Sequence, residues 1–115
     1  MTQSTIDTAT FEELQATAGA DFVRELVDTF LADAPEMLKG LRQALEDGDA
    51  ERFRRVAHTL KSNSNTFGAA TLAVLARQLE LGGLGGVRGD AGAQLDALDA
   101  EYARVAQTLA ELGRA

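Results

Sequence analysis

Apolar side chains recur along this chain at intervals of three and four residues, which is the spacing of one face of an α-helix. The clearest stretch is the C-terminal one, where we predict a helix that begins between Asp90 and Ala93. Its apolar seam consists of Leu95, Leu98, Tyr102, Val105, Leu109 and Leu112. No segment alternates apolar and polar residues as a half-buried strand does. The pattern therefore predicts an all-α protein.

The N-terminal part predicts a tail, a short helix and a long helical pattern. Residues 1–9 are mainly polar and predict a frayed tail. Thr10 and Glu13 have the spacing of a capping box, which predicts a short helix over residues 11–17. A longer helical pattern then covers residues 21–47.

One proline, Pro35, lies inside this long pattern. Proline has no N–H for the helical ladder, and it biases the preceding residue away from helical angles. We therefore expect a break or a kink near Ala34, with helical structure on both sides of it.

The middle of the chain predicts two helices joined by a tight turn. Asp49 is a good N-cap for the first helix. Residues 62–66 are weak helix formers, although the helical register can carry through them to Phe67. Gly68 marks the turn into the second helix. The apolar stripe of the first helix is Phe53, Val56, Ala57 and Leu60, and that of the second is Leu72, Leu75, Ala76 and Leu79.

A glycine-rich segment, residues 82–92, separates the last two helices and predicts a flexible loop. It lacks the GxxxxGK[ST] pattern and follows no strand, so it does not indicate a phosphate-binding loop. Four long amphipathic helices with short connections predict an antiparallel four-helix bundle with an additional short N-terminal helix. We expect residues 1–115 to form a single domain.

Composition removes several classes of function. The chain has 115 residues, no cysteine and one histidine, which excludes disulfide scaffolds, thiol nucleophiles and multi-histidine metal sites. Its formal net charge of −7 argues against general nucleic-acid binding and against anionic membranes as partners. The N-terminus shows no signal peptide. We therefore expect a cytoplasmic protein without a metal site.

The single histidine, His58, is the most informative residue. On a helical wheel it lies about 140° from Phe53, outside the apolar stripe, so we expect it to be exposed. Four basic residues lie within ten positions of the same segment: Arg52, Arg54, Arg55 and Lys61. An exposed imidazole among cations is suited to carrying a phosphoryl group, because its neutral nitrogen is a nucleophile and the cations favour the added anion.

The segment from His58 to Ala69, HTLKSNSNTFGA, closely resembles the phosphorylation motif of the histidine-containing phosphotransfer (HPt) family. The family pattern is His-x-Leu-Lys-Gly/Ser, a few small or polar residues, an apolar residue and Gly-Ala. Ser62 stands where glycine is commonest in the family. The resemblance implies that His58 accepts and donates the phosphoryl group through Nε2.

The resemblance also implies roles for other residues. Lys61 would stabilise the phosphoryl charge, and Glu80 would accept a hydrogen bond from His58 Nδ1. Gly68 would have a structural role at the turn. Response-regulator receiver domains are the expected partners, with a hybrid histidine kinase as a further one, and Mg²⁺ is expected on the receiver only. The expected docking residues are Arg54, Lys61, Ser62 and Asn65.

Two other interpretations compete with this one. A histidine-kinase dimerisation hairpin also carries a phosphorylatable histidine, but that family follows its histidine with an acid and a later proline, whereas Thr59 follows His58 here. A helical interaction module with a non-functional surface histidine is the second alternative. Because one four-helix bundle can close its own core, we expect this protein to be a monomer.

Overall fold

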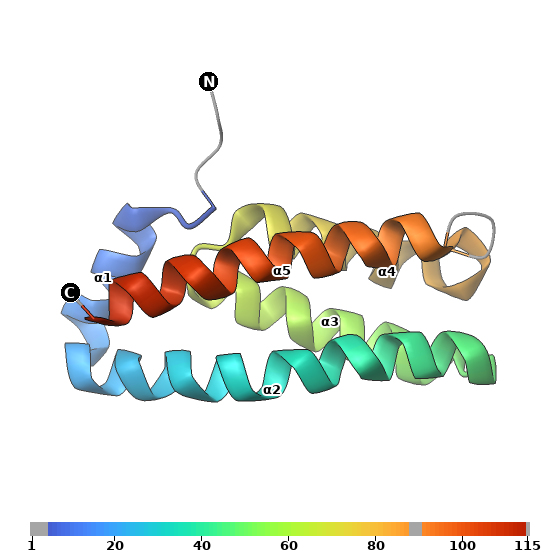
Figure 1. Ribbon diagram of the computed structural model, residues 1–115, viewed down its shortest axis with the longest axis horizontal. Coiled ribbons are helices and arrows are strands. Elements are labelled where there is room, and N and C mark those ends of the chain that lie inside the picture. The colour runs from blue at the N-terminus through green and yellow to red at the C-terminus, as the bar shows by residue number, and fades with distance from the viewer. Residues whose placement is uncertain (1–4, 88–90, 115) are drawn as a thin grey trace, which may run out of the picture.

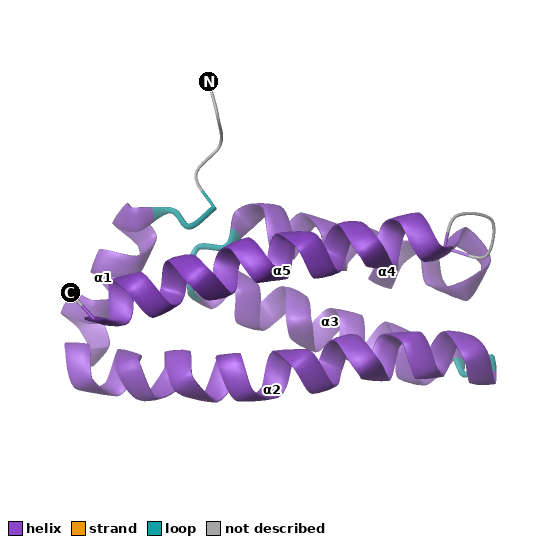
Figure 2. Ribbon diagram, viewed as in Figure 1, coloured by secondary structure: helices purple, strands orange, loops and turns teal. Residues whose placement is uncertain are grey.

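The computed structural model describes residues 5–87 and 91–114. These residues form five α-helices and no strand, so the prediction of an all-α protein is confirmed (Figure 2). Within residues 5–87 and 91–114, none of the helices combines the length and the hydropathy that a membrane span requires. The helices are α1 (Thr8–Ala18), α2 (Ala20–Asp47), α3 (Ala50–Thr66), α4 (Ala70–Val87) and α5 (Ala91–Arg114).

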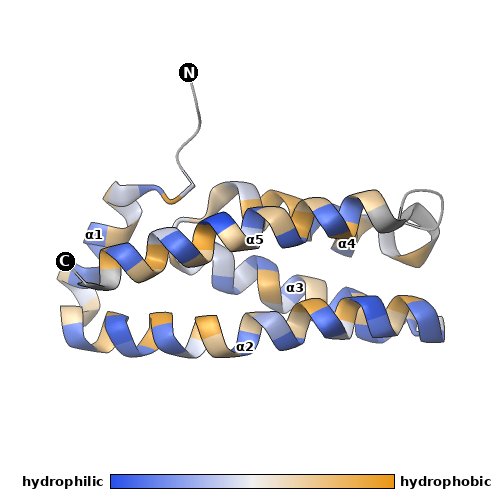
Figure 3. Cartoon of the chain, in the orientation of Figure 1, coloured by the Kyte–Doolittle hydropathy of each residue, from blue (hydrophilic) through white to orange (hydrophobic). Residues whose placement is uncertain are grey.

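The four longer helices run alternately in opposite directions along the molecule, while α1 lies across one end (Figure 1). Helix α3 packs against α2 and α4, and α5 packs against the other sides of α2 and α4. Apolar residues, orange in Figure 3, alternate with polar ones along each helix, because only one face of each helix meets the core. The shared core includes Phe53, Leu41, Leu60, Leu72, Leu98 and Leu109, each almost completely buried.

Residues 5–9 are packed against the protein and lead into α1, so the predicted frayed tail is wrong for them; residues 1–4 lie outside the described part. Asp7, and not Thr10, caps α1: its carboxylate accepts from the Ala9 N–H at 3.1 Å and from the Thr10 hydroxyl at 2.9 Å. Aspartate is a stronger N-cap than threonine, which explains the earlier helix start. Ile6 is only 2% exposed, so burial also holds this segment in place.

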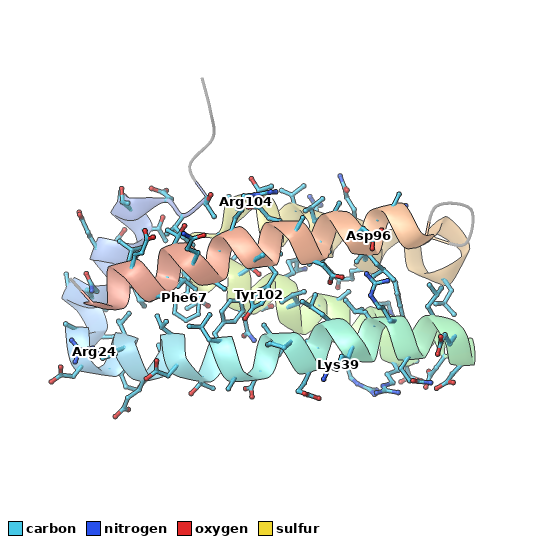
Figure 4. The ribbon with its side chains drawn as sticks, in the orientation of Figure 1. Arg24, Lys39, Phe67, Asp96, Tyr102 and Arg104 are labelled. Carbon is cyan, nitrogen blue, oxygen red and sulfur yellow. The ribbon has the colours of Figure 1, made fainter. Side chains whose placement is uncertain are left out.

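Pro35 does not break α2, which continues for 28 residues through it, so of the break or kink expected near Ala34 the break is wrong. Phe30, Ala34 and Leu41 are all buried, so both halves of the helix keep one face in the same core. The missing N–H of Pro35 would have bonded to the carbonyl of Leu31. The Tyr102 hydroxyl of α5 donates to that carbonyl instead, at 3.5 Å, and Figure 4 shows Tyr102 on α5.

The glycine-rich segment is helical at residues 82–87 and 91–92, so the predicted loop is wrong for these residues. Gly83 interrupts the helix with φ of +59° and ψ of −164°, and a short helical stretch follows it. Leu84 is only 7% exposed, and its burial favours folding this stretch against the core. Helix α5 begins at Ala91, inside the predicted interval, while residues 88–90 lie outside the described part.

The turn between α3 and α4 touches the N-terminal segment. Gly68 has φ of +77°, and a Cβ there would lie 3.0 Å from both the Asp7 carbonyl oxygen and the Thr10 Cβ. The Gly68 carbonyl accepts from the Asp7 N–H at 2.9 Å. Next to this turn, the Phe67 ring packs against Phe30 at a centroid distance of 5.3 Å. Glycine is therefore required here both by backbone angle and by space.

Helices α2 and α5 are also joined by charge. One Arg42 nitrogen, Nη2, lies 3.0 Å from Asp96 Oδ1 and 2.6 Å from Asp99 Oδ2. The hydrogen bonds that Arg42 donates to the two carboxylates, the one to Asp99 first, raise the pKa of Arg42. Asp96 projects from α5 in Figure 4. This cluster fixes the register of α5 against α2 at the end of the molecule away from α1.

Candidate functional site

Helix α3 presents His58 on its outer face. The helix is capped by Asp49, whose side chain accepts from the Arg52 N–H at 3.1 Å, as predicted. Phe53, Ala57 and Leu60 are buried on the inner face. The His58 side chain is 57% exposed, so the predicted exposure of this residue is confirmed. A partner can therefore reach the ring without any unfolding of the helix.

Helix α4 brings Glu80 to the same place. The two residues are 22 positions apart, and the turn at Gly68 reverses the chain so that α3 and α4 pack side by side. His58 Nδ1 lies 2.7 Å from Glu80 Oε2, which is the contact that the family resemblance implied. The Glu80 side chain is only 16% exposed, so the carboxylate is held at the edge of the core.

Lys61, one turn after His58, pairs with the other oxygen of the same carboxylate. Its Nζ lies 2.9 Å from Glu80 Oε1. The Lys61 contact, and to a smaller extent the His58 contact, lowers the pKa of Glu80 below its ordinary value of 4.5, and partial burial opposes this shift. Glu80 is therefore a carboxylate near neutral pH, with no proton to donate to the ring.

The charge of Glu80 sets the state of the imidazole. An ionised carboxylate can only accept a hydrogen bond, so the proton of this contact belongs to His58 Nδ1. In the neutral ring, the lone pair is then on Nε2. The arrangement supplies an exposed ring with a fixed tautomer and a free nucleophilic nitrogen.

A hollow of about 320 Å³ lies beside the His58 ring. We call it the α3 hollow. Besides His58 itself, three of its lining residues lie within two turns before His58, and the remaining one is Glu80 on α4. The lining residues are Glu51, Arg54, Arg55, His58 and Glu80. Arg55 was predicted only as one of the four clustered cations and Glu51 was given no role, although the helical spacing of both residues from His58 places them on the same face.

The predicted docking residues divide into two groups. Arg54, Ser62 and Asn65 are exposed on α3 with His58. Lys61 is turned toward α4 and its side chain is only 24% exposed, because it is paired with Glu80.

Among the described residues, no group of three or more acidic, histidine or cysteine side chains could hold a metal ion.

Comparison with known proteins agrees with this geometry. The Hpt domain family model matches residues 25–108. The crystal structure of histidine-containing phosphotransfer protein B from Pseudomonas aeruginosa PAO1 is similar, with a TM-score of 0.88 and 30% sequence identity over 98% of this chain and 97% of that one. No match was found among curated proteins.

The chain therefore belongs to the Hpt domain family. Members of this family carry phosphoryl groups in phosphorelays and are not catalysts in themselves. They interact with receiver domains and kinases. The protein thus has a histidine phosphotransfer role, and His58 is the single histidine in its sequence.

Proposed function

We propose that His58 accepts a phosphoryl group from the aspartyl phosphate of a receiver domain, or from a kinase, and passes it to the aspartate of another receiver. The observation that carries this proposal is the exposed His58 ring, whose Nδ1 is 2.7 Å from an ionised Glu80. The family match supports it, and the antiparallel four-helix bundle would serve as a rigid scaffold for the ring.

The transfer step follows from the tautomer. The Nε2 lone pair attacks the phosphorus in line, the Nε2–P bond forms, and the bond between phosphorus and the aspartyl oxygen breaks. The aspartate leaves as a carboxylate, while the Nδ1 proton stays on its hydrogen bond to Glu80. Lys61, which lies on the Glu80 side of the ring, would stabilise the negative charge of the phosphoryl group. Mg²⁺ would be held by the receiver and supply charge neutralisation there.

The docking surface would surround His58. Arg54, Lys61, Ser62 and Asn65 would supply polar contacts to the receiver. Leu81, next to Glu80 and 72% exposed, would add an apolar contact. We further propose that the protein acts in the cytoplasm as a monomer, with protein partners and no nucleic-acid or membrane partner.

A labelling experiment tests the proposal. The protein is mixed with a panel of receiver domains phosphorylated in advance, and acid-labile, base-stable label is sought on wild type and on His58→Gln. Label should appear on the wild type only, because glutamine has no nucleophilic nitrogen. Circular dichroism should show equal helix content, because the exposed His58 ring is not part of the core.

Two results would contradict the proposal. Label on His58→Gln would place the phosphoryl group elsewhere. Receiver binding that His58→Ala leaves unchanged, together with no label from any receiver, would instead favour an interaction module in which the histidine is not used.

A further inference from the structure

Two arginines in the α3 hollow have no partner for their charge. Neither the Arg54 nor the Arg55 guanidinium takes part in an ion pair or hydrogen bond within the described residues, and both side chains are exposed. Both line the hollow together with the His58 ring. They stand three and four residues before His58, which places them one helical turn away on the same face.

The third cation near the ring is already engaged. Lys61 lies 2.9 Å from Glu80 Oε1 and is mostly covered, and it does not line the hollow, whereas Arg54 and Arg55 do. Moving Lys61 to a new anion would leave an ionised and largely buried Glu80 without its ion pair to Lys61, which is costly. The two arginines can meet an anion without breaking any existing contact.

We propose that the α3 hollow is the binding site for the phosphoryl group carried by His58, and that Arg54 and Arg55, rather than Lys61, contact its oxygens directly. This inference rests on the function proposed above for His58. A guanidinium presents a planar set of N–H donors that matches phosphate oxygens, and such charge-assisted bonds are strong. The site is therefore formed within the free protein, before any receiver docks.

Glu51 lines the same hollow and opposes the two arginines. Its carboxylate has no ion-pair partner among the described residues, so its negative charge acts on any anion bound there. Two cations and one anion thus set the electrostatic potential at the phosphoryl group, beyond the Glu80–Lys61 pair. Removing an arginine and removing Glu51 must then have effects of opposite sign.

The test uses the full chain and no receiver. Phosphoramidate phosphorylates His58: Nε2 displaces ammonia from phosphorus, forming the N–P bond as the donor's P–N bond breaks. The ³¹P shift is then followed against pH. Arg54→Gln and Arg55→Gln should each raise the midpoint for protonation by roughly 0.5 pH unit, because nearby cations favour the dianion, and Glu51→Gln should lower it. Arg24→Gln, an exposed arginine on α2, is the matched control and should leave the midpoint unchanged.

Each outcome is decisive. Midpoints that stay at the wild-type value in both arginine variants, or a larger shift from Lys61→Gln than from either, would overturn the inference while leaving His58 as the phosphorylated residue. No ³¹P signal of phosphohistidine on wild type would defeat the proposed function as well. Circular dichroism and melting of each variant exclude unfolding as the cause of a shift.

Discussion

The Glu80 carboxylate is placed between two nitrogen groups, with Lys61 Nζ at 2.9 Å on one oxygen and His58 Nδ1 at 2.7 Å on the other. Each contact is made to the ionised carboxylate, so the native state favours the deprotonated form of Glu80. These contacts therefore lower the pKa of Glu80. The same pair of contacts that fixes the imidazole tautomer therefore contributes to stability, and this contribution depends on pH.

We predict that Glu80→Gln lowers the free energy of unfolding at pH 7 and that the difference from wild type shrinks as the pH falls. Because the folded-state pKa of Glu80 lies below 4.5, the contribution is complete above pH 4.5 and is lost as the pH decreases through the folded-state value. Urea unfolding at pH 7 and at about pH 3.5 measures this. Glu46→Gln, an exposed acid on α2, is the control. A difference that is the same at both pH values would contradict the prediction.

At the scale of elements, the α3–α4 turn decides whether His58 and Glu80 meet. We predict that Gly68→Ala destabilises the protein by about 2–4 kcal/mol, since alanine there combines a left-handed backbone with contacts at 3.0 Å. Gly48→Ala is the matched control: its φ is +70°, but nothing lies within 4 Å, so we expect only about 1–2 kcal/mol. Equal losses in denaturant unfolding would show that close packing at Gly68 contributes nothing.

Helix α2 depends on a contact from α5 at its proline. We predict that Tyr102→Phe costs about 0.5–1 kcal/mol, because the Leu31 carbonyl then loses its donor. Pro35→Ala should raise stability by at least about 1 kcal/mol by returning the missing N–H. In the Pro35→Ala background, Tyr102→Phe should cost less, since Leu31 has a helical partner again. A double-mutant cycle by urea unfolding tests this, and strictly additive effects would rule out the shared carbonyl.

The spacing of apolar residues was sufficient to predict that the helices exist and which face of each is buried. Each helix buries one face, and the residues of that face recur in the sequence at intervals of three and four. The errors fall where a partner distant in the sequence decides the local structure. Pro35 is tolerated because the Leu31 carbonyl meets Tyr102, which is 71 residues further along. Leu84 is held by the core although glycines surround it, and Ile6 is held although its neighbours are polar.

The candidate site was also predictable in part: its two central residues could be named from the sequence, but not all of their contacts. Helical spacing exposes His58, and the motif places Glu80 opposite it, so both residues could be named from the sequence. The pairing of Lys61 with Glu80 could not be predicted, because it depends on how far α4 is offset along α3. For the same reason the sequence showed a basic cluster, but not that Arg54 and Arg55 would be left unpaired in a hollow beside the ring.

At the scale of the whole molecule, the local charge of the α3 hollow differs in sign from the net charge of the chain. The net charge is −7, yet the α3 hollow has two unpaired arginines against the single unpaired Glu51. In the transfer proposed above, the phosphorylated face of the partner would meet this local field, while the acidic remainder of the surface repels other acidic surfaces.

The N-terminal segment closes one end of the molecule, outside the region that the family model matches. Ile6 is 2% exposed within the shared core, and the Asp7 N–H bonds to the carbonyl of Gly68 in the α3–α4 turn. This segment therefore supports the turn that brings α4 against the His58 helix. It should then unfold together with the four long helices in one transition, as in a single cooperative domain.

We predict that Ile6→Ala lowers the free energy of unfolding by about 2–5 kcal/mol, the usual cost of truncating a fully buried isoleucine. Glu12→Ala, on the exposed side of α1, should change it by less than about 0.5 kcal/mol. Urea unfolding followed by circular dichroism should show one transition for both variants, shifted only in Ile6→Ala. A shift of less than about 0.5 kcal/mol for Ile6→Ala, or a separate early transition, would mean that residues 5–18 fold independently of the helices that carry the site.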